Sequence, residues 1–265
     1  MRNNLNLSYK SLGESSSKNV IIFIHGLFGD SGNLRRIASH FSSHFYCICV
    51  DVRNHGNSFH SITHDYDTMA EDILQLMKNK NIESAHLIGH SMGGKVALKC
   101  ASLNPKQIQS LVIIDIAPIS YKVNKHKSIF EGLLKTESIL KDENLNRNEI
   151  YSVLNTYVKE KSISQFLLKS LVKTNGYYSW KFNLQSLSEN YSKIMEWTEI
   201  KPIQTKTLFI KGNLSDYILP EYSRDSLKQV PNSKIHIIAN AGHWVHAEYP
   251  VKLIAIIEKF YQYEL

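Results

Sequence analysis

Six short segments of the chain are almost wholly apolar and rich in β-branched residues. They are residues 19–25, 46–51, 85–90, 110–116, 206–212 and 234–240. A strand with one exposed face alternates apolar and polar residues, whereas these segments are apolar at consecutive positions. Consecutive apolar residues are typical of strands that are buried on both faces. The pattern therefore predicts a mostly parallel sheet with helices packed against each side.

Segments with helical periodicity separate most of these strands. Apolar residues recur at helical spacing in residues 34–41, 68–78, 91–103, 222–229 and 251–261. Strands that alternate with helices form βαβ units, in which a helix connects two parallel strands. We therefore expect an α/β fold with a doubly wound sheet, and 265 residues are enough for one sizeable domain.

The alternation stops between about residues 118 and 202, where the pattern contains no convincing strand. Residues 127–142, 147–160 and 162–173 have amphipathic helical patterns instead. A structureless loop of this length is implausible in a compact domain, so residues 118–202 are expected to form a helical cap. The core then comprises residues 1–117 and 203–265. Loops that follow the carboxyl ends of parallel strands surround the usual ligand crevice, and the cap is expected there.

Composition excludes several classes of protein. The 31 Lys and Arg residues exceed the 24 Asp and Glu residues, but they are spread along the chain, without the basic block of a nucleic-acid-binding tail. The three cysteines lie in apolar segments, and their odd number argues against a disulfide framework. No apolar segment approaches the roughly 18 residues of a membrane span, and the N-terminus does not resemble a signal peptide. We expect a cytoplasmic protein that is a monomer or a weak dimer.

A serine flanked by glycines marks the junction between a predicted strand and a predicted helix. Residues 89–93 read Gly-His-Ser-Met-Gly, which fits the G-x-S-x-G motif in its strand–turn–helix context. In this turn the backbone of the serine is strained, and side chains in place of Gly89 and Gly93 would collide with neighbouring elements. The pattern predicts that Ser91 is a nucleophile rather than an ordinary helix cap.

A serine nucleophile needs a base, and a third group usually orients that base. In hydrolases with this motif, the histidine follows the acid late in the chain. His243 comes directly after the last predicted strand and is favoured over His246, which is expected to pack in the next turn. Two acids follow strands at the same edge of the sheet, Asp115 and Asp216, and either could reach the histidine.

Acyl transfer also requires hydrogen-bond donors for the developing oxyanion. One is expected to be the backbone N–H of Met92, at the N-terminus of a helix. The other is expected from the segment HGLFG at residues 25–29, where Gly26 lets the chain turn so that the N–H of Leu27 points inward. His25 is expected to brace this loop rather than to react.

Four motifs together resemble a known family. The segments HGLFG, DVRNHGNS (51–58), GHSMGG (89–94) and AGHWVHAE (241–248) follow one another as in the α/β-hydrolase superfamily. IDIAP (114–118) and QFLLKS (165–170) are similar to its YbfF-type esterase branch. The resemblance implies a helical cap inserted after the sixth strand, and a serine esterase that acts on small acyl esters or on acyl thioesters such as coenzyme A derivatives.

The resemblance also bears on the acid, because in this branch it is the aspartate of the IDIAP segment, here Asp115. The wider superfamily has its acid after the next strand, where this chain has Asp216, so Asp216 remains the alternative. The chain also departs from the common R-G-x-G pattern, since Asn54 follows Arg53. Asparagine tolerates a positive φ better than most residues, so the turn is expected to be retained.

The expected mechanism combines Ser91, His243 and the chosen acid with the N–H groups of Leu27 and Met92, and it needs no metal and no cofactor. Arg53 and Lys95 could meet an anionic group, but a solvated or structural role is favoured. Relatives that cleave C–C bonds, act as lyases or support cofactor-free haloperoxidation share the triad and remain alternatives, as does a non-catalytic receptor. Aromatic residues of the cap and the oxyanion loop are candidates for an apolar acyl pocket. They are Phe28, Phe166, Tyr178, Trp180 and Phe182.

Overall fold

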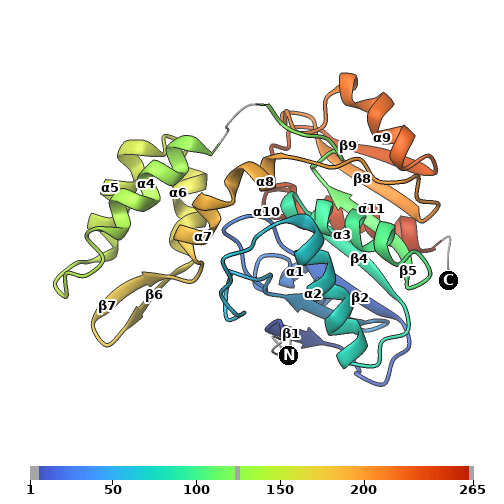
Figure 1. The fold of residues 1–265 in the computed structure, drawn as a ribbon, viewed down its shortest axis with the longest axis horizontal. Helices are drawn as coiled ribbons and strands as arrows, with labels where there is room; N and C mark the ends of the chain where they lie inside the picture. Colours follow the sequence, from blue (N-terminus) through green and yellow to red (C-terminus); the bar gives the residue numbers. More distant parts are fainter. Residues whose placement is uncertain (1–5, 123–125, 263–265) are drawn as a thin grey trace.

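The computed structural model describes residues 6–122 and 126–262, which form a seven-stranded sheet with helices on both faces and an insertion to one side (Figure 1). The order of the strands is β1-β3-β2-β4-β5-β8-β9. Strand β1 (Tyr9–Leu12) pairs antiparallel with β3 (Tyr46–Val50), and every other neighbouring pair is parallel. The predicted mostly parallel, doubly wound sheet is therefore confirmed. The remaining strands are β2 (Val20–Ile24), β4 (Ala85–His90), β5 (Ile108–Ile114), β8 (Lys206–Gly212) and β9 (Ser233–Ile238).

The central strands have a hydrophobic core on each face. In β2, Ile22 and Ile24 point into one core, whereas Ile21 and Phe23 point into the other, and all four side chains are fully buried. Helices α2 (Tyr66–Asn79) and α3 (Met92–Leu103) cover the first face, and α1 (Arg35–Phe41) and α11 (Pro250–Gln262) cover the second. Burial on both faces explains why the sequence of β2 lacks the alternation of a half-exposed strand.

The prediction that every strand is buried on both faces is wrong for β9. This strand lies at the edge of the sheet and pairs with β8, and its residues Lys234, Ile235, His236 and Ile237 are exposed. Ile235 and Ile237 keep 55% and 56% of their surface accessible. Local sequence does not reveal that a strand is at an edge, because strand order depends on the whole chain.

The insertion, residues 118–202, follows β5, the fifth strand along the described chain, whereas the resemblance implied the sixth. In the described residues, β1 to β5 precede the insertion. The insertion projects from the sheet on the left of Figure 1. Its helices are α4 (Lys127–Glu137), α5 (Arg147–Tyr157), α6 (Lys161–Leu168), α7 (Leu184–Glu189) and α8 (Tyr191–Met195).

The insertion also contains two strands that were not predicted from the sequence. Residues 162–173 were predicted to be helical, but α6 ends at Leu168, and β6 (Leu171–Thr174) pairs antiparallel with β7 (Tyr177–Trp180). Asn175 and Gly176 connect the strands with φ angles of 51° and 90°. Asn-Gly is the preferred sequence of a two-residue hairpin turn, because both positions need a positive φ. The Asn-Gly pair in the sequence therefore indicates a hairpin at this position.

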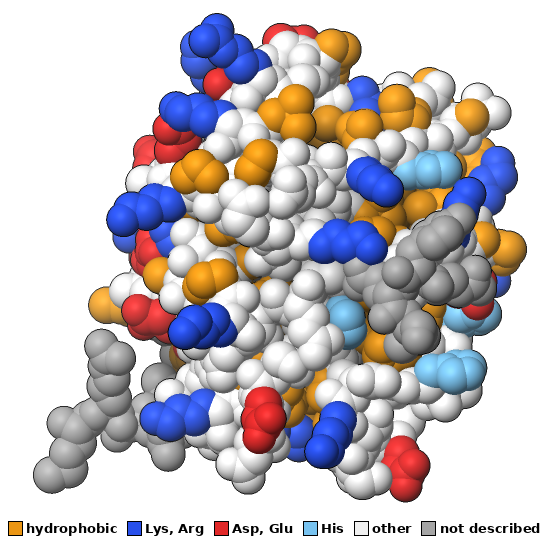
Figure 2. All heavy atoms as spheres, turned by 90° about the vertical axis from the view of Figure 1, so that its right-hand side faces the viewer, with side chains coloured by type: hydrophobic (Ala, Val, Ile, Leu, Met, Phe, Trp, Pro, Cys, Tyr) orange, Lys and Arg blue, Asp and Glu red, His pale blue; other side chains and the backbone are white. Residues whose placement is uncertain are grey.

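Charged side chains do not form one large patch on the face seen in Figure 2, where Lys and Arg lie among acidic and apolar side chains. No helix in residues 6–122 and 126–262 is long and apolar enough to cross a membrane. Beyond the insertion, the chain forms a 3-10 turn at Pro220–Tyr222 and the short helices α9 (Ser223–Gln229) and α10 (Val245–Glu248) before α11.

Candidate active site

Ser91 lies at a sharp turn between β4 and α3, as the motif predicts. Its backbone has φ 52° and ψ −121°, a conformation that L-amino acids rarely adopt. A Cβ atom on Gly89 would lie 2.2 Å from the carbonyl oxygen of Gly93, and a Cβ atom on Gly93 would lie 2.2 Å from that of Ile24. The two glycines therefore let β4, α3 and β2 approach closely enough to form the turn.

Replacement of Gly93 by alanine is expected to lower the free energy of unfolding by at least about 2 kcal/mol, because the added Cβ collides with backbone rather than with a movable side chain. Urea denaturation measures this change. Gly32→Ala is the matched control, since its Cβ would meet only the side chain of Asp30, on an exposed loop. Equal stabilities for the two variants would contradict the steric explanation.

His243, in the loop between β9 and α10, connects Ser91 to a carboxylate. Its Nε2 atom is 3.0 Å from Ser91 Oγ, and its Nδ1 atom is 2.7 Å from Asp115 Oδ2. With the proton on Nδ1, the imidazole donates to Asp115 and its Nε2 can accept the hydrogen of the serine hydroxyl. Three residues that are far apart in the sequence thus form one continuous row of hydrogen bonds.

The structure brings Asp115, and not Asp216, to His243. Asp115 follows β5 with a positive φ of 54°, and its carboxylate is fully buried. The N–H of Gly212 donates to Oδ1 over 3.0 Å, and the hydroxyl of Ser215 donates to Oδ2. These two donors, together with His243, stabilise the ionised carboxylate away from solvent. The side chain of Asp216 is exposed and lines an outer groove.

The two expected oxyanion donors flank Ser91. A Cβ atom on Gly26 would lie 3.2 Å from Ser91 Cβ, so the HGLFG loop passes directly over the serine. The N–H of Phe28 donates to His55 Nε2 over 3.1 Å. Among the hydrogen bonds of the described residues, none uses the N–H of Leu27 or of Met92. Met92 is the first residue of α3, where backbone N–H groups lack helical partners.

Buried neutral histidines hold the loops of the site. His25 donates from Nδ1 to the carbonyl of Gly26 over 2.7 Å and accepts the N–H of Val52 over 3.1 Å, and burial lowers its pKa. This agrees with the bracing role expected for it. His90 donates to the carbonyl of His243 over 2.9 Å, and burial lowers the pKa of His90 well below its usual value. His246 packs beside His90, and burial lowers its pKa to about 3.

A small cavity of about 30 Å³ opens beside Ser91, and an outer groove of about 750 Å³ shares part of its wall. Phe28 lines the cavity, and Phe166 lines both spaces. The apolar wall around the serine also includes Ile129 and Leu167 from the insertion. The serine therefore faces a narrow apolar space that widens outward between the insertion and the sheet.

Three aromatic residues expected in the pocket wall are not among its lining residues. Trp180 stacks on Phe182 with the ring planes 9° apart, and Phe182 packs behind Phe28. Tyr178 lies on the β6–β7 hairpin, where the ammonium of Lys173 covers its ring. Tyr178 and Trp180 thus lie on the hairpin, and Phe182, just after it, lies behind Phe28.

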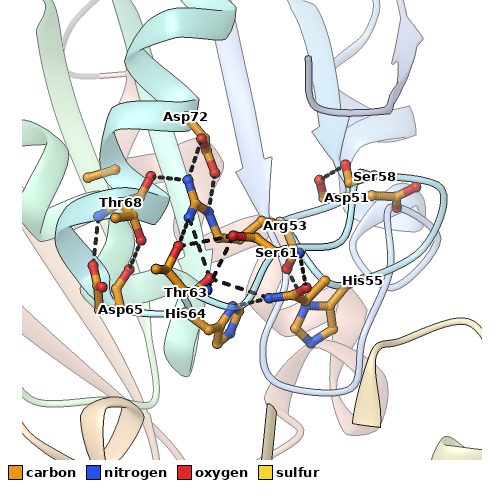
Figure 3. Close-up of polar contacts among 12 residues, drawn as sticks. Asp51, Arg53, His55, Ser58, Ser61, Thr63, His64, Asp65, Thr68 and Asp72 are labelled. Carbon is orange, nitrogen blue, oxygen red and sulfur yellow. Dashed lines mark hydrogen bonds and ion pairs between the residues drawn. The ribbon is translucent and has the colours of Figure 1, made fainter. Parts of the chain in front are cut away.

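Arg53 does not face the site. It forms a bidentate ion pair with Asp72 over 2.6 and 2.8 Å and donates to Thr63 Oγ1 over 2.8 Å (Figure 3). Its neighbour Asn54 has φ 65°, as expected for the residue that departs from the R-G-x-G pattern, and its side chain accepts the N–H of Ser61 over 2.7 Å. This network joins the loop after β3 to helix α2.

Two neighbours of the site were missed in the sequence. Ser215 donates to Asp115, and the ring of Tyr217 stacks on His243 with centroids 4.0 Å apart. Both flank Asp216, the alternative acid, in the loop after β8. Within the described part of the chain, no three His, Cys, Asp or Glu side chains converge as metal ligands would.

Comparisons with known proteins agree with this architecture. Residues 19–136 match the family model for the alpha/beta hydrolase fold. The chain is 34% identical to the esterase YbfF of Escherichia coli, over 97% of this chain and 98% of that protein. It is 33% identical to the mouse (Mus musculus) sn-1-specific diacylglycerol lipase ABHD11, over 97% and 85%. A solved structure described as a marine microorganism esterase has a TM-score of 0.91 and 36% identity, and the match covers 97% of this chain and 99% of that one. The chain therefore belongs to the α/β-hydrolase superfamily, in the branch of YbfF-type esterases.

Proposed function

We propose that the protein is a serine esterase that hydrolyses small acyl esters through an acyl-enzyme intermediate. The observation that carries the proposal is the row of hydrogen bonds from Ser91 Oγ through His243 to Asp115, with distances of 3.0 and 2.7 Å. A serine hydroxyl is a weak nucleophile at neutral pH, and an imidazole held in this geometry can remove its proton as it attacks.

In the first half-reaction, Ser91 Oγ attacks the acyl carbon while His243 Nε2 takes the hydroxyl proton. The N–H groups of Leu27 and Met92 stabilise the negative charge on the carbonyl oxygen, and such a donor is worth about 2.7 to 4 kcal/mol. Asp115 keeps the Nδ1 proton on His243 and stabilises the imidazolium. His243 then protonates the leaving alcohol, which departs and leaves the acyl group on Ser91.

In the second half-reaction, a water molecule takes the place of the alcohol. His243 removes a proton from this water, which attacks the acyl carbon of the ester formed on Ser91. The same two N–H groups stabilise the second oxyanion, and collapse of the intermediate returns the proton to Ser91 and releases the carboxylic acid. Every step uses groups of the chain and water.

The shape of the site supports esters with a short acyl group. The cavity of about 30 Å³ beside Ser91 is narrow, whereas the groove of about 750 Å³ outside it leaves room for a larger leaving group. Thioesters, including acyl-coenzyme A, react by the same steps and are included in the proposed range. The names of the relatives, an esterase and a diacylglycerol lipase, are consistent with carboxylic ester substrates.

The proposal is tested by rates of hydrolysis for p-nitrophenyl acetate, butyrate and octanoate and for the corresponding acyl-coenzyme A thioesters. We expect the highest kcat/KM for the short acyl groups, and stoichiometric labelling of Ser91 by a fluorophosphonate. Faster turnover of octanoate than of acetate would contradict the assignment of the narrow cavity. Labelling of Ser91 without turnover of any ester would instead favour a receptor, or a reaction of another type.

A further inference from the structure

A fully buried lysine lies one turn beyond Ser91 on helix α3. Lys95 has no accessible surface, and its Nζ atom is 3.4 Å from the carbonyl oxygen of Glu196. Aromatic rings surround the ammonium at distances that allow cation–π interaction, 5.2 Å for Tyr66, 4.8 Å for Tyr121 and 5.6 Å for Trp197. A buried charge without such partners would be strongly unfavourable.

The partners of Lys95 come from both ends of the insertion. Tyr121 lies where the chain enters it, and Trp197 lies where the chain leaves it. The two ends are joined directly, because the N–H of Tyr121 donates to the carbonyl of Met195 over 2.9 Å and the N–H of Trp197 donates to Ser120 Oγ over 2.8 Å. We call these two ends, residues 117–121 and 194–200, the stem. Lys95 thus fastens the stem to the helix that begins at Ser91.

The stem in turn contacts the loop that supports His243. The hydroxyl of Tyr121 donates to the carbonyl of Tyr217 over 2.6 Å, and the ring of Tyr217 stacks on His243 with centroids 4.0 Å apart. The hydroxyl of Ser215 in the same loop, and the N–H of Gly212 at the end of β8, donate to Asp115. A shift of the stem would therefore displace both neighbours of the imidazole.

We propose that Lys95 is a positioning residue: it fixes the stem on helix α3 and, through Tyr121 and Tyr217, holds His243 in line with Ser91 and Asp115. This inference rests on the proposed function, because it assigns Lys95 a part in the same reaction. Lys95 does not line the cavity beside Ser91, so its effect is expected on kcat rather than on the binding of a small ester.

The protonation of Lys95 has a consequence for stability. Burial lowers its pKa to about 7, while the surrounding ring faces favour the ammonium. Of the groups that face it, Tyr66 and Tyr121 have pKa values that burial raises above the usual tyrosine value, and Glu196 contributes its backbone carbonyl while its side chain is exposed. On the next turn of α3, Lys99 pairs with Asp67 over 2.9 Å.

The sign of the pH dependence follows from this lowered pKa. Between about pH 7 and the usual lysine value of about 10.4, the unfolded chain holds the proton and the folded chain has lost it. The stability of the protein therefore increases with pH across this interval through Lys95. Lys95→Met lacks this contribution. The difference in melting temperature, variant minus unsubstituted protein, should therefore be more positive at pH 6 than at pH 9.5.

The decisive experiment compares Lys95→Met with Lys99→Met, which removes an amine of the same helix that pairs with Asp67 of α2 rather than with a stem residue. For p-nitrophenyl acetate, we expect Lys95→Met to lower kcat about tenfold or more with KM changed less than about threefold, because small displacements of a catalytic group cost large factors in rate. Hydrogen exchange of stem peptides should accelerate in Lys95→Met. Lys99→Met should leave kcat and stem exchange unchanged within about twofold.

Tyr121→Phe provides an independent test, since it keeps the ring beside Lys95 and removes the hydrogen bond to Tyr217. We expect it to reproduce the loss of kcat with unchanged exchange in stem residues 194–200, whereas the N–H of Ala117, which donates to the hydroxyl of Tyr121 over 2.9 Å, should exchange faster. Full activity would overturn the proposal even if Lys95→Met failed to fold. Wild-type kcat and stem exchange in folded Lys95→Met would also overturn it. If Ser91→Ala remained active, the proposed function itself would fail, whereas an inactive Ser91→Ala beside a fully active Lys95→Met would remove only the role of Lys95.

Discussion

Ser91→Ala is expected to lower kcat for p-nitrophenyl acetate by about 10⁴-fold or more, because among the hydrogen bonds of the described residues no other hydroxyl bonds to the imidazole of His243. The residual rate would come from the oxyanion donors and from binding alone. Loss of the hydroxyl removes no apolar contact, so the fold and the melting temperature should change little. Steady-state rates on protein of verified fold measure the effect.

Ser152→Ala is the matched control for Ser91→Ala. Ser152 is exposed on helix α5, and its hydroxyl donates only locally, to the carbonyl of Asn148. Its rate should stay within about twofold of the unsubstituted protein, as for other exposed surface positions. His243→Ala should be as inactive as Ser91→Ala, and the double variant should be no worse than either, because the two residues act as a unit. An active Ser91→Ala would refute the proposed nucleophile.

Asp115→Asn is expected to lower kcat by about 10³- to 10⁴-fold, because an amide can donate to Nδ1 and so favour the imidazole tautomer that cannot accept the serine proton. Asp216→Asn should change kcat less than about threefold, since Asp216 is exposed and the carboxylate that accepts from His243 Nδ1 is that of Asp115. The pair is matched in chemistry, since both variants replace a carboxylate by an amide of the same shape. Rates for both variants on the same ester measure the difference.

A larger loss of kcat in Asp216→Asn than in Asp115→Asn would instead identify Asp216 as the acid, at the position usual in the wider superfamily. Asp115→Asn can also lose activity because it is less stable, since the carboxylate of Asp115 accepts the N–H of Gly212 and the hydroxyl of Ser215. The melting temperature of Asp115→Asn must therefore be measured beside kcat. A pH–rate profile distinguishes a misplaced imidazole from a smaller active fraction.

The central part of the fold could be predicted from the sequence because its signals are local. Helix α3 shows its period over a few residues, and β2 is apolar at consecutive positions because it is buried on both faces. The exposure of β9 could not be predicted, since its apolar sequence is compatible with the centre or the edge of a sheet. The hairpin β6–β7 was not predicted although its Asn-Gly turn is present. The helix predicted for residues 162–173 overlaps β6, whereas α6 ends at Leu168.

In the candidate site, too, residues in local motifs could be predicted, whereas features that depend on tertiary structure could not. Ser91 and His243 stand in local motifs, so their positions could be predicted. The acid could not be chosen from spacing, since Asp115 and Asp216 both follow strands at the same edge. What distinguishes them is tertiary: Asp115 follows β5, which lies directly beside β4 in the sheet, whereas Asp216 follows β8 and its side chain is exposed. Lys95 likewise gives no sign in the sequence that it is buried, since lysines are usually exposed.

The distance along the chain between Ser91 and His243 also bears on biosynthesis. Strands β2 to β5 can begin to associate while the ribosome is still translating the insertion, but the proposed base follows β9, near the far end of the polypeptide. Long-range pairing of this kind is slow and comes late in folding. Under the proposed mechanism, a nascent chain that has exposed the turn at Ser91 would therefore be unable to acylate itself on cellular esters until the loop with His243 has emerged and docked.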